Sequence, residues 1–176
     1  MCIRSVWLIL AAVHAQHPWM HPDQKLGESS RLIRALVHGD LEGAAQLLAA
    51  GADPNETDNE ESITTLYAAQ EFIRNSKARH VMLRRLIKAG ALPDQVTSDG
   101  STTLMLAAYH GDVRSAKILL DSGADPLRPN DRGETAVSAA KRNGNEELSH
   151  ILMEYVGESA LRQLGHDREA RLRVEL

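Results

Sequence analysis

Histidine, serine and aspartate are the side chains here that could act as acids, bases or nucleophiles, and the sequence contains 8 histidines. None of them has a spacing that would pair a nucleophile with a base. His38 and His110 each precede a Gly-Asp dipeptide, and this recurrence indicates a structural turn that is used twice. The sequence contains no G-x-S-x-G, H-E-x-x-H or glycine-rich phosphate-loop motif. We therefore predict that the chain is not an enzyme and has no catalytic residue.

Metal binding is suggested only by His17 and His21, with Asp23 nearby, because these are residue types that bind metal ions. They lie in a segment, residues 16–28, that contains two prolines and no hydrophobic periodicity. A structural metal site requires four ligands that are held rigidly. We therefore interpret this segment as a polar linker and predict no metal site and no cofactor.

The first 15 residues have the features of an export signal. Arg4 precedes an apolar run over 6–13, and Val13 and Ala15 supply the small residues before a cleavage point. This pattern predicts a signal peptide at 1–15 and a periplasmic or secreted mature protein. The alternatives are a buried N-terminal helix that packs on the following domain, or a misassigned start codon. In those cases the protein would be cytoplasmic.

The composition narrows the class of protein further. With 43% hydrophobic and 3% aromatic residues, the sequence predicts one soluble domain with an aliphatic core. The net charge of −4 argues against nucleic acid as a partner, because nucleic-acid binding requires a basic face. No apolar run reaches the roughly 18 residues that a membrane-spanning helix needs.

The organisation of the chain follows from residues 100–126, which contain two short helical patterns in tandem. Thr102 can cap the first helix, which ends at Gly111, and the second helix ends at Gly123. Helices of about ten residues are unstable alone in water, so this pair requires copies of itself on either side. The copies exist at constant spacing: Gly100, Thr102 and Leu104 recur as Gly133, Thr135 and Val137, while Leu119, Gly123 and Pro126 recur as Leu86, Gly90 and Pro93 and as Leu47, Gly51 and Pro54.

A fixed period with these residues resembles the ankyrin repeat, whose pattern is roughly G-x-T-P-L-H-x-A-A-x-x-G, then a leucine pair, then G-A-D. The resemblance implies an all-α solenoid of about four helix-turn-helix units with protruding hairpin fingers. The predicted units are 29–61, 62–99, 100–132 and 133–157, followed by a C-terminal tail at 158–176. The Thr-Thr-Leu-Met-Leu-Ala-Ala form at 102–108 resembles the bacterial members of the family.

Two departures from the repeat pattern are visible in the sequence. Ser62 stands where the finger of another unit has glycine. The second unit is longer than the third, and the extra residues lie in the link from Phe72 to Arg79. Stacked helices leave no room inside the array, so we expect this insertion at an exposed edge.

Members of this family bind partner proteins along the fingers and the exposed face of the first helices, and the resemblance implies the same for this chain. The fingers lie at 53–62, 93–100 and 126–133 and are largely acidic, which predicts a partner with a basic surface. Three aromatic residues, Tyr67, Phe72 and Tyr109, lie on first helices, where aromatic anchors inside a charged rim would concentrate binding energy. The acidic finger residues are Asp58, Glu60, Glu61, Asp99, Asp131 and Glu134, against Arg132. The predicted partner-binding residues are Glu60, Glu61, Ile63, Phe72, Ser98, Asp99, Ser101, Tyr109, His110, Asp131, Arg132, Glu134 and Arg142.

The alternative is that the acidic fingers are ordinary solvated turns and that Tyr67 fills the core. The function that the resemblance implies is a monomeric, non-enzymatic module for protein–protein interaction. One alternative is an immunity protein or enzyme inhibitor that occludes the active site of its target. Another is a cytosolic or secreted effector, if residues 1–15 are retained.

Overall fold

The computed structural model describes residues 31–58 and 62–157. The predicted signal peptide, linker and C-terminal tail lie outside the described residues, as do Glu60 and Glu61 of the first finger. These assignments therefore stay predictions.

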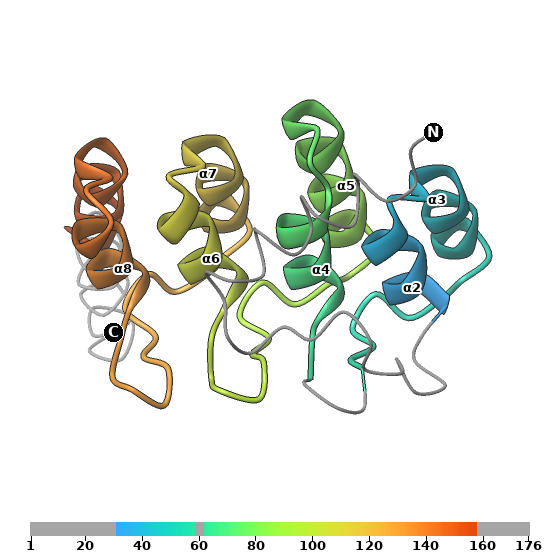
Figure 1. The fold of residues 1–176 in the computed structure, drawn as a ribbon, viewed down its shortest axis with the longest axis horizontal. Coiled ribbons are helices and arrows are strands. Elements are labelled where there is room, and N and C mark those ends of the chain that lie inside the picture. Colours follow the sequence, from blue (N-terminus) through green and yellow to red (C-terminus); the bar gives the residue numbers. More distant parts are fainter. Residues whose placement is uncertain (1–30, 59–61, 158–176) are drawn as a thin grey trace, which may run out of the picture.

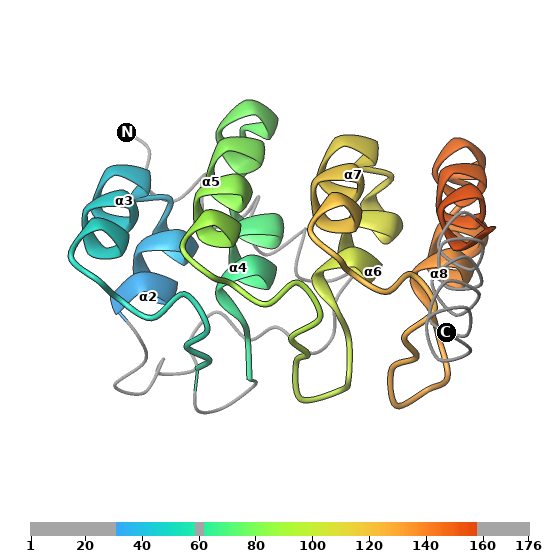
Figure 2. The same cartoon turned by 180° about the vertical axis from the view of Figure 1, so that it is seen from behind.

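The described residues form four pairs of antiparallel helices that stack side by side in the order of the sequence, with loops protruding from one edge (Figures 1 and 2). The first helices pack on one another in the order α2, α4, α6 and α8, and the second helices pack in the order α3, α5 and α7. The predicted all-α array with protruding fingers is confirmed. The pairs are α2 (Arg31–His38) with α3 (Leu41–Ala49), α4 (Thr65–Phe72) with α5 (Ser76–Lys88), α6 (Thr103–His110) with α7 (Val113–Asp121), and α8 (Ala136–Arg142) with a helix over 146–157.

A threonine starts three of the first helices, because its hydroxyl satisfies a backbone amide that the helix itself leaves unpaired. Thr64, Thr102 and Thr135 have extended backbones, and each side-chain oxygen accepts a hydrogen bond from the amide three residues along, at 3.1, 3.2 and 3.2 Å. Ser138 returns a hydrogen bond from its position in α8 to the amide of Thr135, which completes a capping box. The helix starts predicted from the threonines are therefore confirmed.

The insertion in the second unit does not form a simple link between helices. Asn75 caps α5 by accepting a hydrogen bond from the amide of Ala78 at 3.0 Å, so α5 begins at Ser76. As a result α5 has 13 residues, whereas α3 and α7 have 9 each. Figure 1 shows α5 extending beyond its neighbours at the edge opposite the fingers. The expected exposed position is correct, but the inserted residues lengthen a helix because an N-cap residue lies upstream of them.

Two tight turns show why glycine recurs in the array. Gly111 ends α6 in the left-handed region at φ +67°, where a side chain would also meet Asn145 Oδ1 at 2.6 Å. Gly100 and Gly133 have φ values of +77° and +75° in their fingers. Ser62, which stands at the corresponding position of the first finger, has the same kind of backbone at φ +52°. The repeat register therefore imposes a left-handed turn on a residue that adopts it at an energetic cost.

Buried aliphatic side chains form one continuous core through all four pairs. Leu32, Leu66 and Leu104 occupy equivalent positions in successive first helices, and each is at most 1% exposed. Tyr67 is 5% exposed and belongs to this core, so the core-filling interpretation of this residue is correct. Because every unit buries its apolar face only against its neighbours, the array folds as one body.

Candidate functional site

The second finger is held by the carboxylate of Asp99. Its Oδ1 accepts hydrogen bonds from the hydroxyl of Thr97 at 2.6 Å and from the amide of Ser101 at 3.2 Å. Its Oδ2 accepts hydrogen bonds from the hydroxyl of Ser101 at 3.0 Å and from the guanidinium of Arg132 at 3.3 Å. Burial raises the pKa of Asp99, but these hydrogen bonds and the positive charge of Arg132 outweigh it and hold the pKa below its ordinary value.

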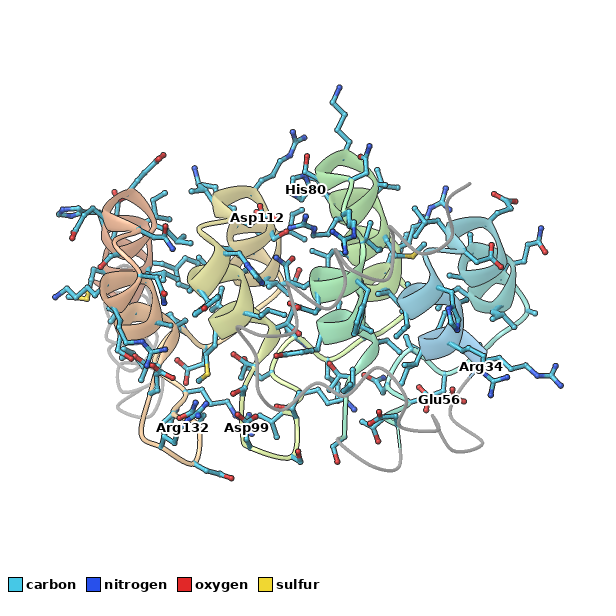
Figure 3. All side chains as sticks on the ribbon, in the orientation of Figure 1. Arg34, Glu56, His80, Asp99, Asp112 and Arg132 are labelled. Atoms are coloured by element: carbon cyan, nitrogen blue, oxygen red, sulfur yellow. The ribbon has the colours of Figure 1, made fainter. Side chains whose placement is uncertain are left out.

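The third finger is organised by the buried side chain of Asn130. Its Oδ1 accepts hydrogen bonds from the amides of Arg132 and Glu134, at 3.0 and 2.9 Å. The amide of Asp131 donates to the carbonyl of Asp99 at 3.1 Å, which joins the third finger to the second. Arg132 and Asp99 lie beside each other between the two fingers (Figure 3). The neighbouring fingers therefore form a connected wall.

A pocket of about 290 Å³ lies between these two fingers and the first helices α6 and α8. Its floor is apolar, since Met105, Leu106 and Ala139 are all buried. Charged side chains from both fingers and from the end of α8 surround it. We call this pocket the finger groove; its lining residues are Tyr67, Asp99, Ser101, Met105, Leu106, Tyr109, Asn130, Arg132, Glu134, Ala139 and Arg142.

The rim of the finger groove contains two ion pairs, Arg132 with Asp99 and Arg142 with Glu134. In each pair the cation is the more exposed partner. The side chains of Arg132 and Arg142 are 67% and 61% exposed, whereas those of Asp99 and Glu134 are 50% and 17% exposed. Sequence reasoning had counted both carboxylates as free acidic charge, but the structure pairs each of them with an arginine.

The structure brings together six of the thirteen predicted partner-binding residues around the finger groove. Ser98 and Asp131 are exposed on the fingers but do not line the groove. Phe72 packs partly buried against the core at the end of α4. The six that line the groove are Asp99, Ser101, Tyr109, Arg132, Glu134 and Arg142.

Two of the residues assigned to the first finger have other roles. Ile63 is only 8% exposed and belongs to the hydrophobic core, so its predicted place on the binding surface is wrong. Asp58 is 4% exposed, and its Oδ1 accepts a hydrogen bond from the amide of Ile63 at 2.7 Å. Asp58 therefore stabilises the base of the finger and does not contribute an exposed acidic charge. Alternation along the hairpin turns these two side chains inward, and this direction depends on the register of Thr57 with Thr64.

The end of α6 contributes a small polar cluster beside the groove. The ring of His110 packs edge-to-face on Tyr109, with the centroids 5.3 Å apart. Its Nε2 lies 3.2 Å from Oε2 of Glu71, which belongs to α4 of the preceding unit. These contacts hold the end of α6 and the aromatic side chain at one edge of the groove.

Sequence reasoning did not identify several groove residues. Asn130 lacks the charge or aromatic ring that suggested the others, although Asn next to Pro129 is a signal for a side-chain-stabilised turn. Met105 and Leu106 were expected only as parts of a helix. Their exposure to the groove depends on the distance between α6 and α8, which no single repeat specifies.

Two surveys cover the same part of the chain. Within residues 31–58 and 62–157, no group of three histidine, cysteine or carboxylate side chains could hold a metal ion. None of the helices that the structure describes is long and apolar enough to cross a membrane.

The family model for ankyrin repeats in three copies matches residues 32–130, which is more than half of the chain. Curated relatives occur in animals and in a bacterium. The murine nuclear factor NF-kappa-B p105 subunit is 35% identical over 111 residues, which are 62% of this chain and 11% of that protein. An ankyrin repeat-containing protein of Treponema pallidum (strain Nichols) is 32% identical over 110 residues, which are 62% of this chain and 35% of that protein.

The mitochondrial disaggregase of Bos taurus is 31% identical over 131 residues, which are 74% of this chain and 18% of that protein. The chain thus spans about a third or less of the length of these relatives. Because the relatives include both animal and bacterial proteins, the predicted bacterial type is not supported by them. The matched residues, the stacked helical pairs and the fingers together show that this chain belongs to the ankyrin-repeat family.

Proposed function

We propose that this chain is a non-enzymatic module that binds a partner protein through its fingers and the adjoining face of its first helices. Ankyrin repeats are generally modules for protein–protein interaction, and scaffolds of this family are typically non-enzymatic. The observation that supports this site is the finger groove, where an apolar floor lies inside a rim of exposed charged side chains. This arrangement is the usual anatomy of a protein interface.

The size of the groove suits one anchoring side chain. Its volume of about 290 Å³ is at the lower limit of the roughly 300–1,000 Å³ that small-molecule pockets usually have. Tyr109 lies at the edge of the groove, where an aromatic ring adds contact area at a low entropic cost. We expect Tyr109→Ala to weaken the complex by about 2 kcal/mol, mainly through faster dissociation.

A basic partner surface is part of the proposal for the outer edge of the fingers. Asp53, Asp125 and Asp131 are exposed there, and exposed carboxylates steer a cationic partner over long distances. The steering should weaken as salt shortens the screening length from about 10 Å at 0.1 M to about 3 Å at 1 M. Roles as an inhibitor or as an effector are narrower forms of the same proposal, since each would use this surface on a particular target.

The test places a photo-crosslinking amino acid at Ser98, on the second finger, or at Lys117, on the outer face of α7. Both residues are exposed, so neither replacement disturbs the core. Irradiation in the native host should give an adduct from the Ser98 position, and Tyr109→Ala should reduce its yield. Mass spectrometry of the adduct identifies the partner. An adduct that forms only from the Lys117 position would place the partner on the second helices and contradict the proposal.

Export is a separate proposal that rests on Arg4 and the apolar run at 6–13. Mass spectrometry of the protein from its native host should then find an N-terminus at Gln16. Intact Met1 on cytosolic protein would contradict export, without affecting the proposed binding surface.

A further inference from the structure

We propose that the finger groove recognises an acidic side chain, Asp or Glu, in an extended segment of the partner, next to an apolar side chain that enters the pocket. This inference rests on the proposed function and adds the chemistry of the ligand. It concerns short-range contacts inside the groove. The long-range attraction by the outer edge of the fingers is a separate effect.

The acceptors of the groove are already occupied. Asp99 accepts four hydrogen bonds, two at each carboxylate oxygen, and a carboxylate offers about four such positions. The side chain of Glu134 is mostly buried and is paired with Arg142. Oδ1 of Asn130 already accepts two backbone amides. An incoming cation would therefore have to displace a bond that stabilises one of the fingers.

The donors of the groove, in contrast, have capacity left. A guanidinium group carries five N–H donors. Among the described residues, Arg132 uses one nitrogen, Nη2, on Asp99, and Arg142 uses Nη1 on Glu134. Both arginine side chains are more than half exposed, so their remaining donors are accessible from the groove. Hydrogen bonds between a guanidinium and a carboxylate are charge-assisted and geometrically specific. The ligand that completes this surface is an anion that accepts hydrogen bonds.

An acidic side chain fits this surface better than a C-terminal carboxylate. Recognition of a chain terminus usually uses a nest of free backbone amides. The backbone amides on both walls are already engaged: those of Arg132 and Glu134 on Asn130, and that of Ser101 on Asp99. The amide of Asp131 donates to the carbonyl of Asp99. Only side-chain donors remain, and they lie at the rim, above the apolar floor.

The adjacent apolar side chain follows from that floor. Met105, Leu106 and Ala139 are buried against the repeat core, yet they line the pocket. Covering them removes apolar surface from water, which is the main favourable term in most protein association. An extended segment alternates its side chains, so one apolar residue can enter the pocket while an acidic residue close to it reaches the rim.

The experiment selects peptides from a random displayed library on the immobilised full chain. Peptides that compete with one another should share an acidic residue close to an apolar one. Arg132→Gln and Arg142→Gln should each weaken a selected synthetic peptide by about tenfold, because each removes charge-assisted hydrogen bonds. Arg128→Gln is the matched control, since Arg128 is exposed on the same finger but does not line the groove. It should leave the affinity within about twofold, as expected for a rim charge outside the contact.

A second arm changes the peptide. Replacing its Glu by Gln should weaken binding to the wild-type chain by about tenfold and should have little further effect on the arginine variants, as a double-mutant cycle requires. Amidating the C-terminus of the peptide should have no effect. A peptide that needs its free C-terminus would overturn the assignment to an acidic side chain.

The remaining outcomes separate this inference from the proposed function. Basic peptides that lose affinity with Tyr109→Ala would overturn the acidic ligand and keep the binding surface. Peptides that ignore all groove variants but are lost with Lys117→Gln would overturn both. A library that yields no peptide dependent on Arg132 or Arg142 overturns the inference. Unchanged melting temperatures of the exposed arginine variants would show that the fold is retained.

Discussion

Asp112, the N-cap residue of α7, also accepts a hydrogen bond from Arg79 of α5 at 2.8 Å, so one carboxylate both starts a helix and joins two repeats. The same carboxylate accepts hydrogen bonds from the amide and hydroxyl of Ser115, at 3.0 and 2.9 Å. His80 places its Nε2 3.1 Å from Oδ1 of Asp112 (Figure 3). The side chains of Arg79, His80 and Asp112 are all mostly buried.

We predict that Asp112→Asn lowers the free energy of unfolding by about 1–3 kcal/mol. Asparagine is an equally good N-cap residue, so the substitution keeps the helix start and removes only the charge that faces Arg79 and His80. Urea denaturation followed by circular dichroism measures the loss. Asp40→Asn is the control, because Asp40 caps α3 in the same way at 2.9 Å but is exposed. It should cost less than about 0.5 kcal/mol, and equal losses would show that the inter-repeat contacts contribute nothing.

The effect of Asp112→Asn should depend on pH. Burial raises the pKa of Asp112, but the hydrogen bonds from Ser115 and the contact with His80 outweigh it, so the pKa lies below its ordinary value of 3.8. A lowered pKa in the folded state means that ionised Asp112 stabilises the fold at every pH above that ordinary value. The stabilisation is lost as the pH falls through the lower pKa of the folded state. The stability difference between the wild type and Asp112→Asn should therefore be constant near neutrality and shrink in acid. Urea midpoints across this range measure it, and a difference that grows in acid would contradict the assignment.

Gln70→Leu should stabilise the protein. Gln70 is 1% exposed on α4, and neither amide atom has a hydrogen-bond partner among the residues that the structure describes. The equivalent positions of α2 and α6 hold Leu36 and Ala108, so the site accepts an apolar side chain. Removing a buried unpaired amide should raise the free energy of unfolding by about 1–2 kcal/mol. The urea midpoint should rise, whereas the same change at the exposed Gln46 should shift it little. A fall in the midpoint would mean that the amide is satisfied.

Leu104→Ala should destabilise the array by about 2–5 kcal/mol, because it opens a cavity in the continuous core between three first helices. Leu127, which is 49% exposed on the third finger, provides the matched control. Its replacement by alanine should change stability by less than about 0.5 kcal/mol. Thermal unfolding should move both neighbouring units together with α6, since each unit is stable only against its neighbours. Similar losses from the two substitutions would mean that the core is misplaced.

Much of the fold was predictable from the sequence because its signals are local. Thr102 and Thr135 cap helices through amides only three residues away, and Gly111 ends a helix because its own backbone tolerates a left-handed conformation. Each signal recurs at a constant spacing, so the pairing of helices and the position of the fingers could be read without knowledge of distant contacts. Even the unusual Ser62 was visible as a departure from the repeat.

Only the tertiary structure decided which charges are available for binding. Asp58 and Asp99 look alike in sequence as acidic finger residues, yet one is buried at the base of its finger and the other is saturated by hydrogen bonds. Arg132 reaches Asp99 because successive fingers lie side by side, and Arg79 reaches Asp112 because an extended helix stacks on the next. Such contacts join residues of different repeats. Their geometry depends on how the repeats stack, and the pattern within one repeat carries no information about it.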